Sequence, residues 1–260
     1  GIVKVITVND SQLGNIATDL HISAKVAGGS GVALRKDGGG TLRLSGDNTT
    51  LSSPFIHNGG FVEIGHNNAL GTGLFSVQAD TAAIVGVGAP RTIANEISID
   101  LHPTFLGTDL TFTGNVTLTG NRTLRTMDAA QTVTFSGVIS EGIYGTATLN
   151  KDGRGTLVFT GTNTYSGATT INNNGGTLVL SGNGSLLNSN AIVIGTSGTL
   201  KLDNTGTNNT NRLNDLVNVT NNGGKVHFIG NAVANSSEHI GLYTASGSGT
   251  GEIRMENTSA

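Results

Sequence analysis

The chain has 260 residues, of which 40 are glycine and 3 are proline, and it has no cysteine and no tryptophan. The lack of cysteine excludes disulfides, thiolate metal ligands and a cysteine nucleophile. The formal net charge is −3 and no cluster of lysine and arginine occurs, so the sequence lacks the basic footprint of a nucleic-acid-binding protein. No apolar stretch approaches the roughly 20 residues of a membrane-spanning helix. We therefore expect no nucleic-acid partner and no membrane insertion by this segment.

Short alternating segments recur along the chain, and they predict β-strands. In each one, apolar residues alternate with polar or β-branched residues, and clusters of glycine, asparagine, aspartate and serine follow as turns. In chain order the clearest segments are TLRL (41–44), FVEI (61–64), LTFTGNVTLTG (110–120), TVTF (132–135), TLVF (156–159), TLVL (177–180), TLKL (199–202) and KVHF (225–228). No segment places apolar residues at the helical spacing i, i+3, i+4, i+7. The pattern predicts an all-β protein.

A glycine followed by such a segment recurs at intervals that range from 20 residues (Gly40 to Gly60) to 26 residues (Gly198 to Gly224). Repeats of this length that hold short strands are typical of β-solenoids, in which each repeat makes one turn and stacks on the next. We therefore expect one domain over residues 1–260, a parallel β-helix with about 20–26 residues per coil. The side chains expected to point into its core are those of Leu42, Leu44, Val62, Ile64, Leu157, Phe159, Leu178, Leu180, Leu200, Leu202, Val226 and Phe228.

The sequence also contains a longer repeat, in addition to this short one. The segment LRKDGGGTLRLSGDNT, which begins at Leu34, aligns with LNKDGRGTLVFTGTNT, which begins at Leu149, so the copies are 115 residues apart. We place the internal copies near 34–73 and 149–190. The region between them still alternates as strands do, but in a less regular phase.

The second copy resembles the passenger-associated transport repeat, the autotransporter-associated β-strand repeat of large bacterial surface proteins. The matching residues are Leu149, Lys151, Gly153, Gly155, Thr156, Leu157, Gly161, Asn163, Tyr165, Gly167, Thr169, Ile171, Gly176, Thr177 and Leu178. The first copy matches as far as Asn48 and then departs, with Thr50 in place of the family's tyrosine. The resemblance implies a right-handed parallel β-helix in an exported bacterial protein. It also implies an elongated stalk without catalytic residues.

The sequence KDG occurs in both copies, at 36–38 and 151–153. A cation site or a glycan contact is one interpretation. The other is a plain turn, which we favour because Asp-Gly adopts the positive φ angles that tight turns need. The acidic residues are otherwise scattered singly, and the calcium-binding nonapeptide pattern is absent.

Glycosidase chemistry needs two carboxylates across a groove, and Asp80 and Asp100 are the best-spaced pair for neighbouring turns. No tryptophan or tyrosine platform accompanies this pair. Basic residues for a lyase are available at Arg91, Arg122 and Arg125, but a cluster of acidic residues to partner them is missing. The six histidines, interpreted as surface residues, are His21, His57, His66, His102, His227 and His239. We therefore expect no enzyme, no catalytic residue, no metal ligands and no cofactor.

These observations favour a non-catalytic extracellular β-solenoid module of a large bacterial surface protein, acting as a stalk, an adhesin or a filament-forming unit. The expected location is the bacterial cell surface. The expected partners are another copy of the chain, bound end to end, or a surface glycan or host ligand. The alternative is a carbohydrate-active β-helix, either a polysaccharide lyase or a tailspike-like hydrolase.

Overall fold

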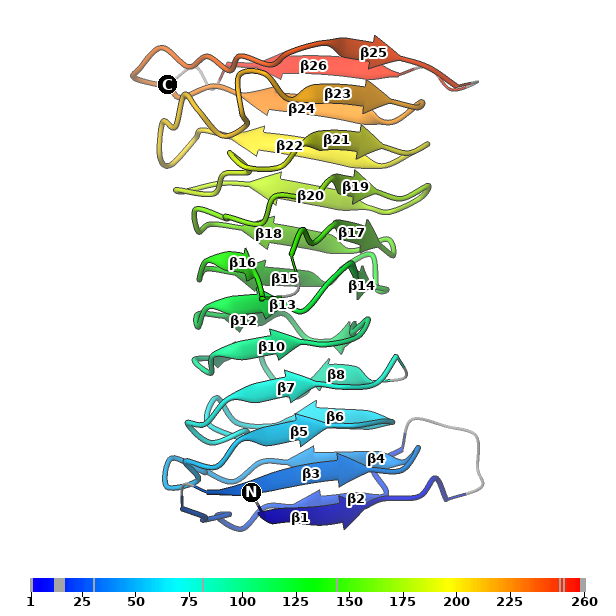
Figure 1. The fold of residues 1–260 in the computed structure, drawn as a ribbon, viewed down its shortest axis with the longest axis vertical. Helices are drawn as coiled ribbons and strands as arrows, with labels where there is room; N and C mark the ends of the chain where they lie inside the picture. Colours follow the sequence, from blue (N-terminus) through cyan, green and yellow to red (C-terminus); the bar gives the residue numbers. More distant parts are fainter. Residues whose placement is uncertain are drawn as a thin grey trace.

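The computed structural model is a rod of stacked coils that describes residues 2–11, 17–29, 31–80, 82–143, 145–247, 249 and 251–257. Figure 1 shows the chain rising in one direction, from β1 at one end to β25 and β26 at the other. Within the described residues every regular element is a strand, and every strand pair is parallel. The predicted all-β solenoid is confirmed.

The coils build three parallel sheets, which in the described part of the chain have 7, 11 and 8 strands. Sheet I contains β1 (Ile2–Thr7), β3 (Val32–Asp37), β5 (Phe55–His57), β7 (Phe75–Val77), β10 (Ile97–Ile99), β13 (Val116–Leu118) and β16 (Ile139–Glu141). Sheet II contains β2 (Leu20–Ile22), β4 (Thr41–Leu44), β6 (Phe61–Ile64), β8 (Ala83–Gly86), β11 (Thr104–Gly107), β14 (Arg122–Thr126), β17 (Leu149–Asp152), β19 (Thr169–Ile171), β21 (Ala191–Ile194), β23 (Asn218–Asn221) and β25 (Tyr243–Ala245). Sheet III contains β9 (Arg91–Ile93), β12 (Leu110–Phe112), β15 (Thr132–Phe135), β18 (Thr156–Phe159), β20 (Thr177–Leu180), β22 (Thr199–Asp203), β24 (Lys225–Ile229) and β26 (Glu252–Glu256).

The three sheets do not run the full length of the rod. Sheet I covers the N-terminal coils and ends at β16, whereas sheet III begins only at β9. Sheet II is present throughout. The first coils are therefore made of sheets I and II, the middle coils of all three, and the last coils of sheets II and III, with loops on the remaining side.

The core is a ladder of apolar side chains that point inward from successive coils. In sheet III, Leu157 lies level with Leu178 and Leu200. All three are fully buried. Phenylalanines fill the middle coils, where the rings of Phe112 and Phe135 are stacked with centroids 5.0 Å apart. Because one coil alone cannot bury its apolar side, this continuous ladder is what stabilises the stack.

The structure places the two copies of the longer repeat in different sheets, which the sequence pattern did not predict. The segment TLRL of the first copy forms β4 in sheet II, but the matching TLVF of the second copy forms β18 in sheet III. The two copies therefore lie on different sides of the rod, displaced by one sheet around its axis. The reason is the uneven coil length, since Leu42 pairs with Val62 after 20 residues but Leu124 pairs with Lys151 after 27. A separation of 115 residues is consequently not a whole number of coils.

Candidate functional site: the corners of the two repeats

The lysine of the first KDG sequence points into the core. Lys36 shares β3 with Leu34 two residues earlier, and its side chain is fully buried. Its ammonium Nζ donates hydrogen bonds to the carbonyl oxygens of Gly38 and Gly40, both at 2.6 Å, and of Gly59 at 2.7 Å. Gly59 belongs to the next coil, so this lysine ties two coils together. Burial lowers the pKa of Lys36 to about 8, partly opposed by the carboxylates of Asp19 and Asp37.

The second KDG sequence repeats this geometry on another side of the rod. Lys151, on β17, is also fully buried. Its Nζ donates to the carbonyl oxygens of Asp152 at 2.9 Å, Gly153 at 2.7 Å and Gly175 of the next coil at 2.7 Å. Burial lowers the pKa of this lysine to about 7. In both copies three carbonyl oxygens therefore receive the three protons of a buried ammonium.

A buried asparagine in each copy connects three coils. The side-chain Oδ1 of Asn163 accepts the backbone N–H of Ile139 in the coil before, at 2.9 Å, and its Nδ2 donates to the carbonyl of Ser185 in the coil after, at 3.2 Å. Asn48, in the first copy, accepts the N–H of Val26 at 2.7 Å and donates to the carbonyl of Ala69 at 2.6 Å. These amides occupy corners where the strand ladder stops, and they take over its hydrogen-bonding there.

Among the described residues, the second copy has a network of buried hydroxyls that the first copy lacks. The hydroxyl of buried Tyr165 lies 2.8 Å from that of Thr169, which in turn lies 3.1 Å from the hydroxyl of Ser189 in the next coil. The Ser189 hydroxyl also donates to the carbonyl of Gly167 at 2.8 Å. Burial raises the pKa of the Tyr165 hydroxyl, so it stays protonated and acts only as a hydrogen-bonding group.

The glycines of the corners are required by close backbone contacts. A Cβ at Gly161 would lie 2.4 Å from the carbonyl oxygen of Gly137 in the preceding coil. Gly153 has a φ of 75°, and a Cβ there would lie 2.3 Å from the carbonyl oxygen of Thr126. Any side chain at these positions would push neighbouring coils apart.

Residues 34–60 and 149–180 match the family model described as the passenger-associated-transport-repeat. Two segments of the chain are therefore similar to the passenger-associated transport repeat, and we refer to them as the first and second transport repeats. The matched residues include both buried lysines and both coil-linking asparagines. Neither the search of curated proteins nor the search of solved structures finds a match to the chain. The resemblance inferred from the sequence is confirmed for these two segments.

The structure confirms the turn that the KDG sequences predict. Both are turns, and the glycines at 38 and 153 have positive φ. In each turn, carbonyl oxygens accept hydrogen bonds from Nζ of the lysine of the same copy. A signal for this was present in the sequence, because Leu34 and Lys36 are two residues apart in one strand and thus share a face, as do Leu149 and Lys151.

One prediction about the histidines is wrong. His57 is fully buried, because it follows inward-facing Phe55 by two residues in β5 and so points into the core. The others are exposed or partly exposed: His21, His66, His102, His227 and His239. Within the described part of the chain, no group of three or more histidine, aspartate or glutamate side chains could hold a metal ion.

The structure brings Asp80 and Asp100 to the same corner of neighbouring coils. Asp100 accepts hydrogen bonds from the hydroxyls of Ser76 and Ser98, at 2.9 and 2.7 Å. Asp80 accepts the backbone N–H of His102 at 3.2 Å. Both carboxylates thus join parts of adjacent coils, as the asparagines do.

The described residues contain no helix long and apolar enough to span a membrane.

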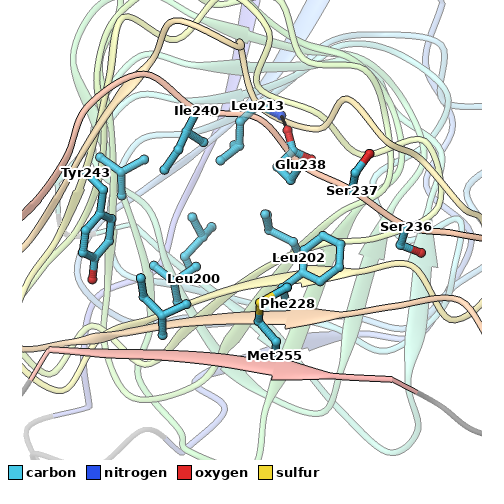
Figure 2. A pocket seen from close by; sticks show the side chains of 13 residues that line it. Leu200, Leu202, Leu213, Phe228, Ser236, Ser237, Glu238, Ile240, Tyr243 and Met255 are labelled. Atoms are coloured by element: carbon cyan, nitrogen blue, oxygen red, sulfur yellow. Dashed lines mark hydrogen bonds between the residues drawn. The ribbon is translucent and has the colours of Figure 1, made fainter.

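An apolar hollow of about 340 Å³ lies inside the last coils, where sheet I no longer contributes side chains. Figure 2 shows its wall, with Leu200, Leu202, Phe228 and Met255 from sheet III and Ile240 from a loop facing the opening. The carboxylate of Glu238 lies at its rim. Its two oxygens accept the backbone N–H groups of residues 212 and 213, so they complete a loop of the protein itself.

Proposed function

We propose that this chain is a non-catalytic structural module of an exported bacterial surface protein, serving as a stalk that holds other parts of that protein away from the cell. The proposal rests on where the structure places four residues of the transport repeats. Lys36, Asn48, Lys151 and Asn163 are all buried, and all of them join neighbouring coils. The repeat signature therefore encodes mechanical continuity of the rod.

The mechanism is that of a continuous hydrogen-bonded ladder. Sheet II contributes one strand per coil, and its 11 described strands, spaced about 4.8 Å apart, extend for about 48 Å. Each coil is bonded to the coils before and after it by backbone and by corner side chains. Such a rod resists local opening because a coil in its interior has two partners to lose.

We also propose end-to-end association with a second copy as the partner interaction of this module. The outermost described strands, β1 and β26, each have a single neighbour in their sheets and carry exposed apolar side chains such as Ile2 and Met255. Strand edges of this kind pair readily with further strands. Sedimentation velocity over a range of concentrations should show growing rods, and a monomer at every concentration would contradict this part of the proposal.

The stalk proposal is tested by surface display. The chain is inserted between a cell-surface anchor and a terminal epitope tag, and the tag is detected with antibody on intact bacteria. The variant Asn48→Ala/Asn163→Ala should reduce the displayed tag and increase its proteolysis, whereas the outward-facing control Asn150→Ala should not. Equal display of all three chains would contradict a role for the repeat corners.

The competing class, a carbohydrate-active β-helix, is tested directly by chemistry. The purified chain is incubated with a panel of polysaccharides, and new reducing ends and unsaturated products are measured. The stalk proposal expects no turnover above the buffer control. Turnover that is lost in the variant Asp80→Asn/Asp100→Asn would replace it with an enzymatic function.

A further inference from the structure

The two transport repeats differ at one core position that lies against the buried lysine. In the first repeat, Lys36 pairs in register with His57 of the next coil. In the second repeat, Lys151 pairs with Ile171. All four side chains are fully buried. The first repeat therefore places an imidazole beside the lysine in the neighbouring coil, where the second repeat places an aliphatic side chain.

The contacts of His57 fix its neutral form. Its Nε2 lies 3.0 Å from the carbonyl oxygen of Gly60, which can only accept, so Nε2 carries the proton. Its Nδ1 is buried and has no hydrogen-bond partner among the described residues. An additional proton would have to reside on Nδ1. The backbone carbonyls of Gly59 and Gly60 favour the charged ring, but they only partly offset the burial that opposes it.

The charges around His57 also oppose protonation. The positive charge of Lys36 on β3 lowers the pKa of His57. On the other side of His57, its partner in register is the uncharged Val77 of β7. Outside the core, the carboxylate of Asp37 pairs with Arg35 at 2.7 Å. The other carboxylates near this corner are likewise engaged, those of Asp19 with the N–H of residue 41 and of Glu63 with the hydroxyl of residue 18. Burial, assisted by the ammonium of Lys36, lowers the pKa of His57 to about 3.

We propose that the Lys36–His57 pair is an acid-sensitive joint that opens the coils of the first transport repeat while the second repeat stays closed. When solution acidity drives a proton onto Nδ1 of His57, two cations lie in adjacent coils inside the core without a carboxylate between them. The coils around β5 then separate, because the open state lets the imidazolium reach water. The second repeat lacks this response since Ile171 cannot take up a proton. The joint would make one end of the rod responsive to an acidic surrounding.

The test is hydrogen–deuterium exchange of the whole chain between pH 7 and pH 5, corrected for the intrinsic exchange rate. A histidine with a pKa of about 3 in the closed state and about 6.5 in the open state raises the opening equilibrium about 25-fold over this range. Peptides from residues 34–64 should lose protection by this factor. Peptides from residues 149–180 should not.

Two reciprocal variants decide the cause. His57→Ile copies the second repeat into the first and should abolish the acid response of residues 34–64. Ile171→His copies the first repeat into the second and should create the response there. If Ile171→His does not fold, His57→Ile still decides. An unchanged acid response in His57→Ile, or equal opening of both repeats in the natural chain, would overturn the proposal.

Discussion

Replacing the coil-linking asparagine of the second transport repeat tests the role assigned to the repeat corners. Asn163 is 2% exposed, and its Oδ1 is the hydrogen-bond acceptor for the backbone N–H of Ile139. In the variant Asn163→Ala this N–H loses its partner within the corner. A buried donor without a partner costs about 1–3 kcal/mol.

The second half of the interaction costs less. The carbonyl of Ser185 accepts two hydrogen bonds from Asn163, one from its side chain and one from its backbone N–H at 3.1 Å. The backbone bond remains in the variant, so this carbonyl keeps a partner. The removal of the amide group leaves a small void in addition. Together we expect the free energy of unfolding to fall by about 2–3 kcal/mol.

The assay is urea unfolding followed by far-ultraviolet circular dichroism. The matched control is Asn150→Ala, because Asn150 faces outward on β17 and its side chain makes no hydrogen bond within the described part of the chain. The control should change the free energy of unfolding by less than about 0.5 kcal/mol. A loss in Asn163→Ala no larger than in the control would refute the assignment of the asparagine as a link between coils.

Two further predictions concern the corners. The variant Gly161→Ala places a methyl group 2.4 Å from a carbonyl oxygen and should lower the free energy of unfolding by at least about 2 kcal/mol in urea titration, whereas Gly206→Ala, which meets nothing within 4 Å, should be nearly neutral. Equal stability of these two variants would contradict the close contact. The unfolded chain binds a proton at Lys151 between pH 7 and 10 that the folded chain does not, because the pKa of this lysine is about 7 when folded and 10.5 otherwise. Stability should therefore rise with pH in this window, by up to about 1.4 kcal/mol per pH unit, and Lys151→Met should remove its part of that slope in urea titrations at each pH.

The fold was predictable because its signals are local and periodic. Segments such as TLVL carry both the alternation that defines a strand and the inward position of their leucines, and the intervals between glycines give the coil length. These features do not depend on which coil meets which. The solenoid and its core could therefore be derived from the sequence without knowledge of the register.

Features that depend on register were not predictable in the same way. The two transport repeats lie in different sheets because the coils between them have unequal lengths. These lengths could not be derived from the sequence, since the strand pattern of the middle region is irregular. The buried positions of Lys36 and His57 were missed because charge and polarity normally indicate the surface. Their spacing of two residues from Leu34 and Phe55 is consistent with an inward position, but nothing in the sequence shows the three carbonyl oxygens that surround the buried lysine.

The central claim is that each turn of the chain stacks on the one before it at the spacing of neighbouring strands. Electron–electron distance measurements between pairs of spin labels test this claim most directly. The chain has no natural cysteine, so the labels attach only to cysteines that are introduced for the experiment. Thr92, Thr111 and Lys201 lie in one register column of sheet III, with Thr92 five strands and Thr111 four strands from Lys201. The pair Thr92→Cys/Lys201→Cys should give a backbone separation of about 24 Å and Thr111→Cys/Lys201→Cys about 19 Å, each with a narrow distribution. Distances that do not differ by one strand spacing, or broad distributions, would contradict the stacked solenoid.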